Sequence, residues 1–168
     1  MKYKVLEKQN SSAWCMLCGM QNPMSPQMKF YVCEGEPKFL IGIIHAVDHH
    51  QSYPDRMHGG MIAAILDETL GRAVQVIDID VWGVTIDLKV TYRRPVPLNE
   101  DLYCITNLDV FNNRMFSGTA KLVNKAGTVL ATAEGRYARL PAESIAGGLT
   151  SDNWFYDDAP VPEYIEIG

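Results

Sequence analysis

The sequence predicts an α+β architecture in which an antiparallel sheet covers one long helix. Three observations support this prediction: one long segment with helical periodicity, strand-like runs before and after it, and short polar links between the later runs. An antiparallel sheet buries one face against a cover, and this chain offers one long helix for that role.

Residues 60–77 carry the helical period. Their apolar side chains recur at spacings of three and four residues, which places them on one stripe of a helix. The stripe consists of Ile62, Ile65, Leu66, Thr69, Leu70, Ala73, Val76 and Ile77. We expect this stripe to face the sheet.

Strand-like runs surround this helix on both sides. Two of them, 28–33 and 38–47, precede the helix and are separated by the turn sequence EGEP, which is typical of a hairpin. Residues 84–92 follow the helix and alternate apolar with polar side chains, as a half-buried strand does. Short polar links predict antiparallel neighbours in the last three runs, which cover 101–111, 114–124 and 128–140.

The length of 168 residues fits a single domain with a normal core. We expect the helix-and-sheet domain to cover residues 28–140, after an N-terminal segment over 1–27 that contains a CxxC motif. A tail over 141–168 follows, and its aromatic run, Trp154 to Tyr156, predicts that part of the tail packs on the domain.

Charge and hydropathy exclude several classes of partner. The net charge is −5 and no basic block is present, which argues against nucleic acid. Neither a signal sequence nor an apolar span of about 20 residues is visible, so we expect a cytoplasmic protein that does not engage a membrane. Its four cysteines, Cys15, Cys18, Cys33 and Cys104, are then expected to be reduced thiols.

The start of the helix carries the most chemical information. A helix that begins at two glycines, Gly59 and Gly60, exposes backbone N–H groups that can bind an anion or a developing oxyanion. Asp67 and Glu68 lie away from the apolar stripe, one on each side of it. They are either solvated acids on an exposed face or the acids of a site.

The motif HGG with an acid nine residues after the histidine, placed between a hairpin and the strand GVTIDLKVTYRRP, resembles the hotdog-fold acyl-CoA thioesterases of the phenylacetate-pathway type. The loop HQSYPDRMHGG and the segment CMLCGMQNP also resemble one bacterial branch of that family. The resemblance covers roughly residues 13–140 and implies a hotdog fold, with the sheet wrapped around one long central helix.

The resemblance implies a role for each matching residue. Asp67 would be the catalytic carboxylate, acting as general base or as nucleophile, and the Gly59 N–H would be the oxyanion donor. Gln51 or Ser52 would help to place water or the thioester, and Thr85 would contribute a hydroxyl from a partner subunit. The family's enzymes are dimers or tetramers with shared sites and act on acyl-CoA, so we expect a homodimer or homotetramer and no cofactor.

Several other residues are open to two interpretations. His58 either catalyses or, as we favour, orders the glycine turn, and the adjacent His49 and His50 are expected to be exposed. Arg56, Arg93 and Arg94 are either solvated or contact CoA phosphates, since arginine pairs well with phosphate. Cys15 and Cys18 are either structural thiols, as we favour, or ligands of a zinc ion shared across a dimer. A zinc site needs about four ligands, and only Cys33 and the histidines suggest themselves as further ones.

Two other functions fit the same pattern. Hotdog-fold hydratases and dehydratases pair a loop histidine with a helix carboxylate, and His50 could supply that histidine. A non-catalytic acyl-CoA-binding dimer is the other alternative. The HGG motif with its spaced acid favours thioester hydrolysis over both.

Overall fold

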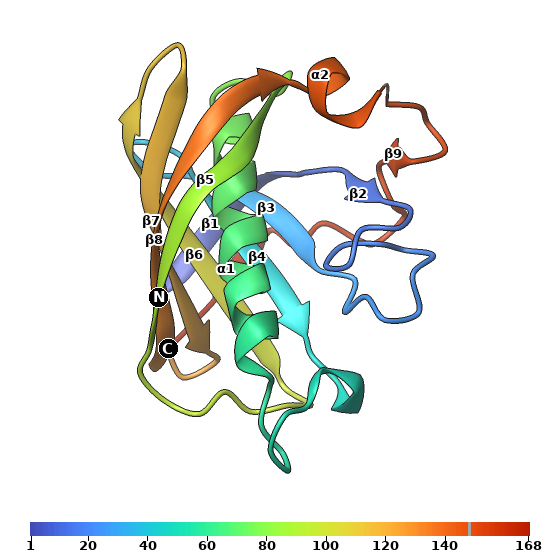
Figure 1. Ribbon diagram of the computed structural model, residues 1–168. Helices are drawn as coiled ribbons and strands as arrows, with labels where there is room; N and C mark the ends of the chain where they lie inside the picture. Colours follow the sequence, from blue (N-terminus) through green and yellow to red (C-terminus); the bar gives the residue numbers. More distant parts are fainter. Residues whose placement is uncertain (148) are drawn as a thin grey trace.

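The computed structural model describes residues 1–147 and 149–168. Within these residues, one eight-stranded antiparallel sheet curves around the central helix α1 (Gly59–Arg72) (Figure 1). The sheet has the strand order β10-β1-β3-β4-β6-β7-β8-β5. Its strands are β1 (Lys2–Lys8), β3 (Lys29–Cys33), β4 (Phe39–His45), β5 (Val81–Tyr92), β6 (Asp101–Phe111), β7 (Met115–Asn124), β8 (Val129–Pro141) and β10 (Tyr164–Glu166).

The apolar stripe of α1 forms the core with the concave face of the sheet. Ile65, Leu66 and Leu70 are fully buried there, as the period of the sequence predicts. The prediction for Ile77 is wrong, because its side chain is 54% exposed. The chain tightens after Arg72 into the 3-10 helix η2 (Ala73–Val76), and this changes the angular position of every later side chain.

The strand pairing also follows the predicted pattern. β3 and β4 form the expected antiparallel hairpin, and β6, β7 and β8 are consecutive antiparallel neighbours. β5 pairs with β8 and lies at the edge of the sheet, along one flank of α1 (Figure 1). A bulge between Thr85 and Asp87 interrupts the β5–β8 register close to the middle of α1.

Both ends of the chain extend the sheet beyond residues 28–140. β1 pairs with β3 on one side and with β10 on the other, so the N-terminal segment and the end of the tail lie side by side. A small second sheet joins β2 (Ser11–Ser12) to β9 (Trp154–Phe155). The short helices η1 (Asp48–His50) and α2 (Ala142–Ala146) lie before α1 and after β8. The domain limits drawn at 27/28 and 140/141 stay a prediction.

Candidate active site

The start of α1 is organised around His58. His58 is the N-cap residue, and its ring Nδ1 accepts a hydrogen bond from the Gly60 N–H at 2.9 Å. The Tyr92 hydroxyl, at the end of β5, donates to the Gly59 carbonyl at 2.9 Å. The Gly59 N–H has no acceptor among the described residues, and it is the first N–H of the helix. This geometry leaves the Gly59 N–H available to an external oxygen.

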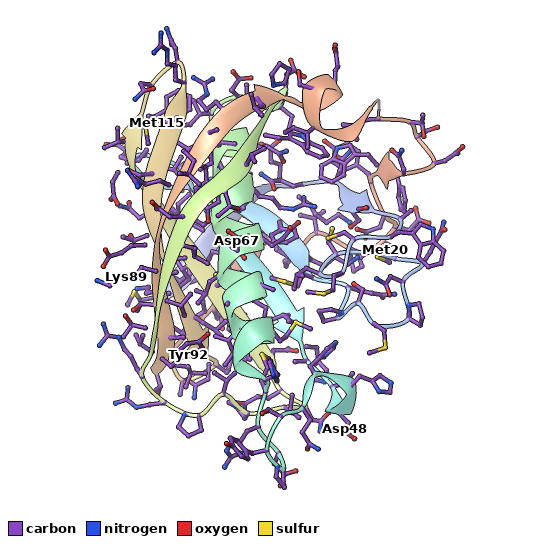
Figure 2. All side chains as sticks on the ribbon, viewed as in Figure 1. Met20, Asp48, Asp67, Lys89, Tyr92 and Met115 are labelled. Carbon is purple, nitrogen blue, oxygen red and sulfur yellow. The ribbon has the colours of Figure 1, made fainter. Side chains whose placement is uncertain are left out.

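Asp67 lies in the middle of α1 and faces β5 and β8 (Figure 2). Its carboxylate accepts a hydrogen bond from the Thr85 hydroxyl at 3.0 Å and another from the Tyr137 hydroxyl at 3.0 Å. Two hydroxyl donors on one carboxylate fix its orientation.

Thr85 and Tyr137 reach Asp67 from within the same chain. The resemblance implied that the Thr85 hydroxyl comes from a partner subunit, whereas both of its contacts with Asp67, at 3.0 and 3.2 Å, are intramolecular. Tyr137 is fully buried and stacks on Phe116 with ring centroids 4.9 Å apart. Burial raises the pKa of the Tyr137 hydroxyl, as does the neighbouring Asp67 charge, so Tyr137 remains a donor.

Asp67 borders a cavity of about 380 Å³ between α1, β5, the N-terminal segment and the tail. Thr85 and Trp82 line it from β5, and Cys15 lines it from the N-terminal segment. The tail contributes Leu149, Asn153 and Trp154, and the Trp154 ring packs against Trp82 with centroids 5.0 Å apart. The prediction that the tail packs on the domain is therefore confirmed for Trp154.

A close approach of α1 and β5 shapes this cavity. A Cβ atom on Gly83 would lie 2.5 Å from the Phe116 ring and 2.8 Å from the Gly71 carbonyl. Only glycine fits at this position, and its small size brings β5 close enough to α1 for Thr85 to reach Asp67.

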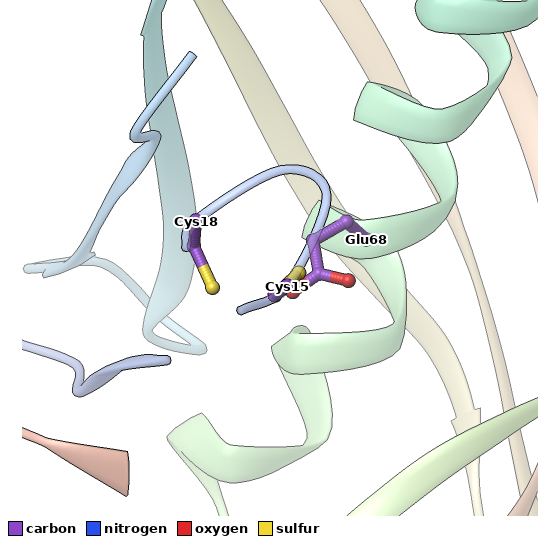
Figure 3. Close-up of side chains that lie close together, drawn as sticks. All are labelled: Cys15, Cys18 and Glu68. Carbon is purple, nitrogen blue, oxygen red and sulfur yellow. Dashed lines mark hydrogen bonds between the residues drawn. The ribbon is translucent and has the colours of Figure 1, made fainter. Parts of the chain in front are cut away.

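Glu68 faces a different neighbourhood from Asp67. It accepts a hydrogen bond from Arg72 Nε at 2.8 Å and lies beside Cys15 and Cys18 (Figure 3). Both acids are half-buried and hydrogen-bonded, so the interpretation of two solvated acids is wrong.

The two cysteines form a tight pair in front of α1. A hydrogen bond from the Cys18 thiol, helped by backbone N–H groups of Cys18 and Leu17, holds the pKa of Cys15 at about 6. The side chain of Arg72 lies against the same pair, with Nη2 3.0 Å from Cys18 Sγ. Cys33 belongs to another part of the core and is no neighbour of this pair.

The loop residues proposed from the sequence lie at the N-terminal end of α1, away from Asp67. Gln51, Ser52 and Arg56 are exposed, and the Gln51 side-chain oxygen accepts a hydrogen bond from the Asp55 N–H at 2.9 Å. Arg93 and Arg94 are exposed and directly follow Tyr92, which contacts Gly59. One group of predicted site residues therefore lies at the end of α1 and consists of His58, Gly59, Gly60, this loop and the two arginines. A second group, Asp67 and Thr85, lies at the middle of the helix.

His50 is buried, contrary to the expectation of exposure. Its Nδ1 accepts a hydrogen bond from the Val47 N–H at 3.1 Å, and its Nε2 lies 2.9 Å from the Met24 carbonyl oxygen. Both ring nitrogens thus hold the loop before α1 in place. His49 is exposed, as expected.

Tyr137 and Tyr92 were not singled out from the sequence. Tyr137 lies on the inward face of a strand whose alternation is visible in the sequence, so its burial could have been inferred. Its contact with Asp67, 70 positions away in the chain, depends on the strand register.

The part of the chain that the structure describes contains no helix long and apolar enough to cross a membrane.

Comparisons with known proteins agree with this fold. Residues 55–131 match the family model of the thioesterase superfamily. Acyl-coenzyme A thioesterase 13 from Homo sapiens is 24% identical over 111 residues, which cover 66% of this chain and 79% of the relative. The Mus musculus protein of the same name is 22% identical over the same coverage.

Solved structures of the superfamily have the same architecture. One thioesterase superfamily protein, 25% identical, gives a TM-score of 0.66 over 73% of this chain and 62% of that chain, which is less than two thirds of its length. Zebrafish thioesterase superfamily member 2, 22% identical, gives 0.57 over 65% and 80%. A hypothetical thioesterase from Streptococcus pneumoniae, crystallised with coenzyme A and 17% identical, gives 0.56 over 61% and 82%. The chain therefore has the hotdog fold of the thioesterase superfamily, and residues 55–131 carry that superfamily's sequence pattern.

Proposed function

We propose that the protein hydrolyses acyl-CoA thioesters, with Asp67 as the catalytic carboxylate. The observation that carries the proposal is the Asp67 carboxylate, held by the Thr85 and Tyr137 hydroxyls on the wall of a cavity. The superfamily match supports thioester hydrolysis, and the relatives named acyl-coenzyme A thioesterase support CoA as the thiol.

The chemistry needs a polarised carbonyl and an activated nucleophile. The Gly59 N–H, with the positive end of the α1 dipole behind it, is suited to hold the carbonyl oxygen as it gains charge. Asp67 either takes a proton from an attacking water molecule or attacks the carbonyl itself to give an anhydride that water then cleaves. In both routes the C–S bond breaks and the CoA thiolate is protonated as it leaves.

These two groups act on one carbonyl only if they come from two copies of the chain. Gly59 and Asp67 are eight residues apart on one helix, which corresponds to about 12 Å along its axis. An oxyanion donor and a base must both lie within about 3 Å of the reacting atoms or of the water between them. A symmetric dimer with antiparallel helices brings Gly59 of one copy to Asp67 of the other.

The edge strand β5 offers a surface for this pairing. It is the last strand of the sheet, so its outer backbone groups are not paired within the sheet. Its exposed apolar residues include Val84 and Ile86, which are 37% and 54% exposed. Pairing of β5 with β5 of a second copy would cover these residues and align the two helices with opposite directions.

The group at the end of α1 is suited to hold the CoA moiety. Arg56 precedes α1, and Arg93 and Arg94 follow Tyr92, so these exposed arginines would supply positive charge at this end of the helix, where guanidinium groups pair well with phosphates. Gln51 and Ser52 lie in the same loop, and one of them would help to place water or the thioester. The acyl chain would then extend toward the cavity beside Asp67.

The alternative of a hydratase or dehydratase is weaker because of His50. That chemistry needs a histidine with a ring nitrogen free to exchange a proton with the substrate. Both ring nitrogens of His50 are engaged with Val47 and Met24, and its side chain is buried.

The test is thiol release from a panel of short, long and aryl acyl-CoAs by wild type and Asp67→Asn. We expect turnover of one substrate class by the wild type and a loss of about a hundredfold or more in kcat for the variant. Equal turnover by both proteins would show that Asp67 has no catalytic role. If neither protein releases thiol but both hydrate a 2-enoyl thioester or bind CoA, hydrolysis is the wrong reaction.

A further inference from the structure

A tight turn in the N-terminal segment presents two sulfur atoms to α1. The Leu17 N–H donates to Cys15 Sγ at 3.3 Å, and the Gly19 N–H donates to the Cys15 carbonyl at 2.9 Å. A Cβ atom on Gly19 would lie 2.3 Å from that carbonyl oxygen, so the turn requires glycine after the second cysteine. A backbone N–H directed at a sulfur atom stabilises the negative charge of a thiolate.

A carboxylate from α1 completes a group of three ligand atoms. Cys15 Sγ, Cys18 Sγ and a Glu68 oxygen all lie within 4.8 Å of one another (Figure 3). The Cys15 sulfur and Glu68 Oε1 are 3.9 Å apart. Tetrahedral zinc with ordinary bond lengths separates a sulfur and an oxygen ligand by about 3.6 Å, so a shift of a few tenths of an ångström suffices to bind an ion.

We propose that Cys15, Cys18 and Glu68 bind a zinc ion that joins the N-terminal segment to α1. Thiolate ligands favour zinc over magnesium or calcium, and a mixed sulfur and oxygen set is within its range. The fourth ligand is water from the cavity, because Cys15 and Glu68 both line that cavity. Binding requires both sulfur atoms as thiolates, so the Cys18 thiol proton is released to solvent.

Arg72 supports a cation at this position through charge balance. Two thiolates and one carboxylate carry three negative charges, which the ion and the Arg72 guanidinium neutralise together. Arg72 donates to Cys18 Sγ at 3.0 Å and to Glu68 Oε1 at 2.8 Å, as hydrogen-bond donors around metal ligands do. Its guanidinium is held over the Phe30 and Trp154 rings, 4.3 and 4.7 Å from their centroids.

The third side chain of this cluster comes from the helix. The sequence suggests only Cys33 and the histidines as further ligands, whereas the structure brings Glu68, which is adjacent to the proposed catalytic residue, to the two sulfur atoms. The ion would stiffen the cavity wall next to Asp67 without contacting the reacting carbonyl. The proposal does not depend on thioester hydrolysis, since it concerns binding alone.

The test measures metal binding by the reduced, metal-stripped full chain. Zinc chloride is titrated against a chromogenic chelator, bound metal is counted by mass spectrometry, and cobalt substitution reports thiolate ligation by its charge-transfer absorption. We expect one ion per chain in wild type and in Cys33→Ser, a buried cysteine outside the cluster that serves as the control. We expect Cys15→Ser and Cys18→Ser to lose the cobalt–thiolate band, and Glu68→Gln to weaken zinc binding by about tenfold or more.

Two results would overturn the proposal. One is a reduced wild-type chain, folded by circular dichroism, that binds neither zinc nor cobalt. The other is zinc binding that Cys15→Ser and Glu68→Gln leave unchanged, which would place the ion elsewhere. A mass deficit of two hydrogens together with no metal uptake after reduction would instead identify the pair as a disulfide.

Discussion

Two adjacent acids of α1 have different chemical surroundings, and the reason is their angular position. Successive residues of a helix are about 100° apart, so Asp67 faces β5 and β8 while Glu68 faces the N-terminal segment. Asp67 receives two hydroxyl hydrogen bonds, and Glu68 receives a guanidinium. The sequence predicted that the acids avoid the core stripe, but the partners of each acid come from distant strands.

Tyr137→Phe tests the positioning of Asp67 with little change in packing, because the stack on Phe116 is kept. A hydrogen bond to a charged group contributes about 1.5–3 kcal/mol, so we expect kcat to fall by about tenfold or more while KM changes less. The measurement is steady-state thiol release. Tyr103→Phe is the matched control, since Tyr103 is a buried tyrosine in a separate core cluster. Wild-type kcat in Tyr137→Phe would show that the contact is not used.

At the scale of elements, the helices and strands with strong sequence periodicity could be predicted, and those without it could not. The stripe of α1 and the alternation in β5 are local patterns, and both elements form where the sequence places them. β1 alternates only from Lys2 to Val5 and β10 has only three residues, so neither is a strong local pattern, and the two strands pair with each other across the ends of the chain. The site combines both kinds of information, which is why Asp67 and Thr85 were identified and Tyr137 was not.

The tail is fixed to the body by a buried ion pair. Lys8 Nζ and Asp157 Oδ1 are 2.8 Å apart, and both side chains are 4% exposed. The Ser11 hydroxyl donates to the same carboxylate at 2.6 Å. Burial alone raises the pKa of Asp157, but the hydrogen bonds from Lys8 and Ser11 outweigh it and hold the pKa well below its usual range.

Asp157→Asn is therefore expected to destabilise the fold and to change its response to acid. The depressed pKa means that Asp157 stabilises the protein fully at neutral pH, and that this contribution is lost as the pH falls below about 4. We expect a loss of about 3 kcal/mol at pH 7, because the buried Lys8 ammonium keeps only the Asp157 and Ala159 carbonyls as acceptors, and a shallower loss of stability as the pH falls from about 5 toward the depressed pKa. Urea unfolding across this range measures both effects. The exposed neighbour Asp158 provides the control, Asp158→Asn, and equal behaviour of the two variants would contradict the assignment.

At the scale of the whole molecule, the two groups of site residues lie too far apart to serve one carbonyl within a single chain. The distance of about 12 Å between Gly59 and Asp67 is set by helix geometry and does not change with side-chain motion. The sequence alone placed both residues correctly on the helix, and their roles came from a family resemblance. How two copies meet is a property of surfaces, such as the β5 edge, that no local pattern specifies.

A shared site predicts that two inactive variants restore each other. Gly59→Pro removes the proposed oxyanion donor at the first helical position, where proline is well tolerated. His58 before it has φ −63° and ψ 136°, a conformation that a following proline favours. We expect Gly59→Pro and Asp67→Asn each to be folded and nearly inactive.

Refolding the two variants together from urea would form mixed dimers. Each mixed dimer contains one site with an intact Gly59 N–H from one chain and an intact Asp67 from the other. Half of the dimers formed at equal concentrations are mixed, so about a quarter of the wild-type activity should return. Each variant refolded alone is the control. If both residues acted within one chain, mixing would restore nothing, because every chain would keep one defect in its own site.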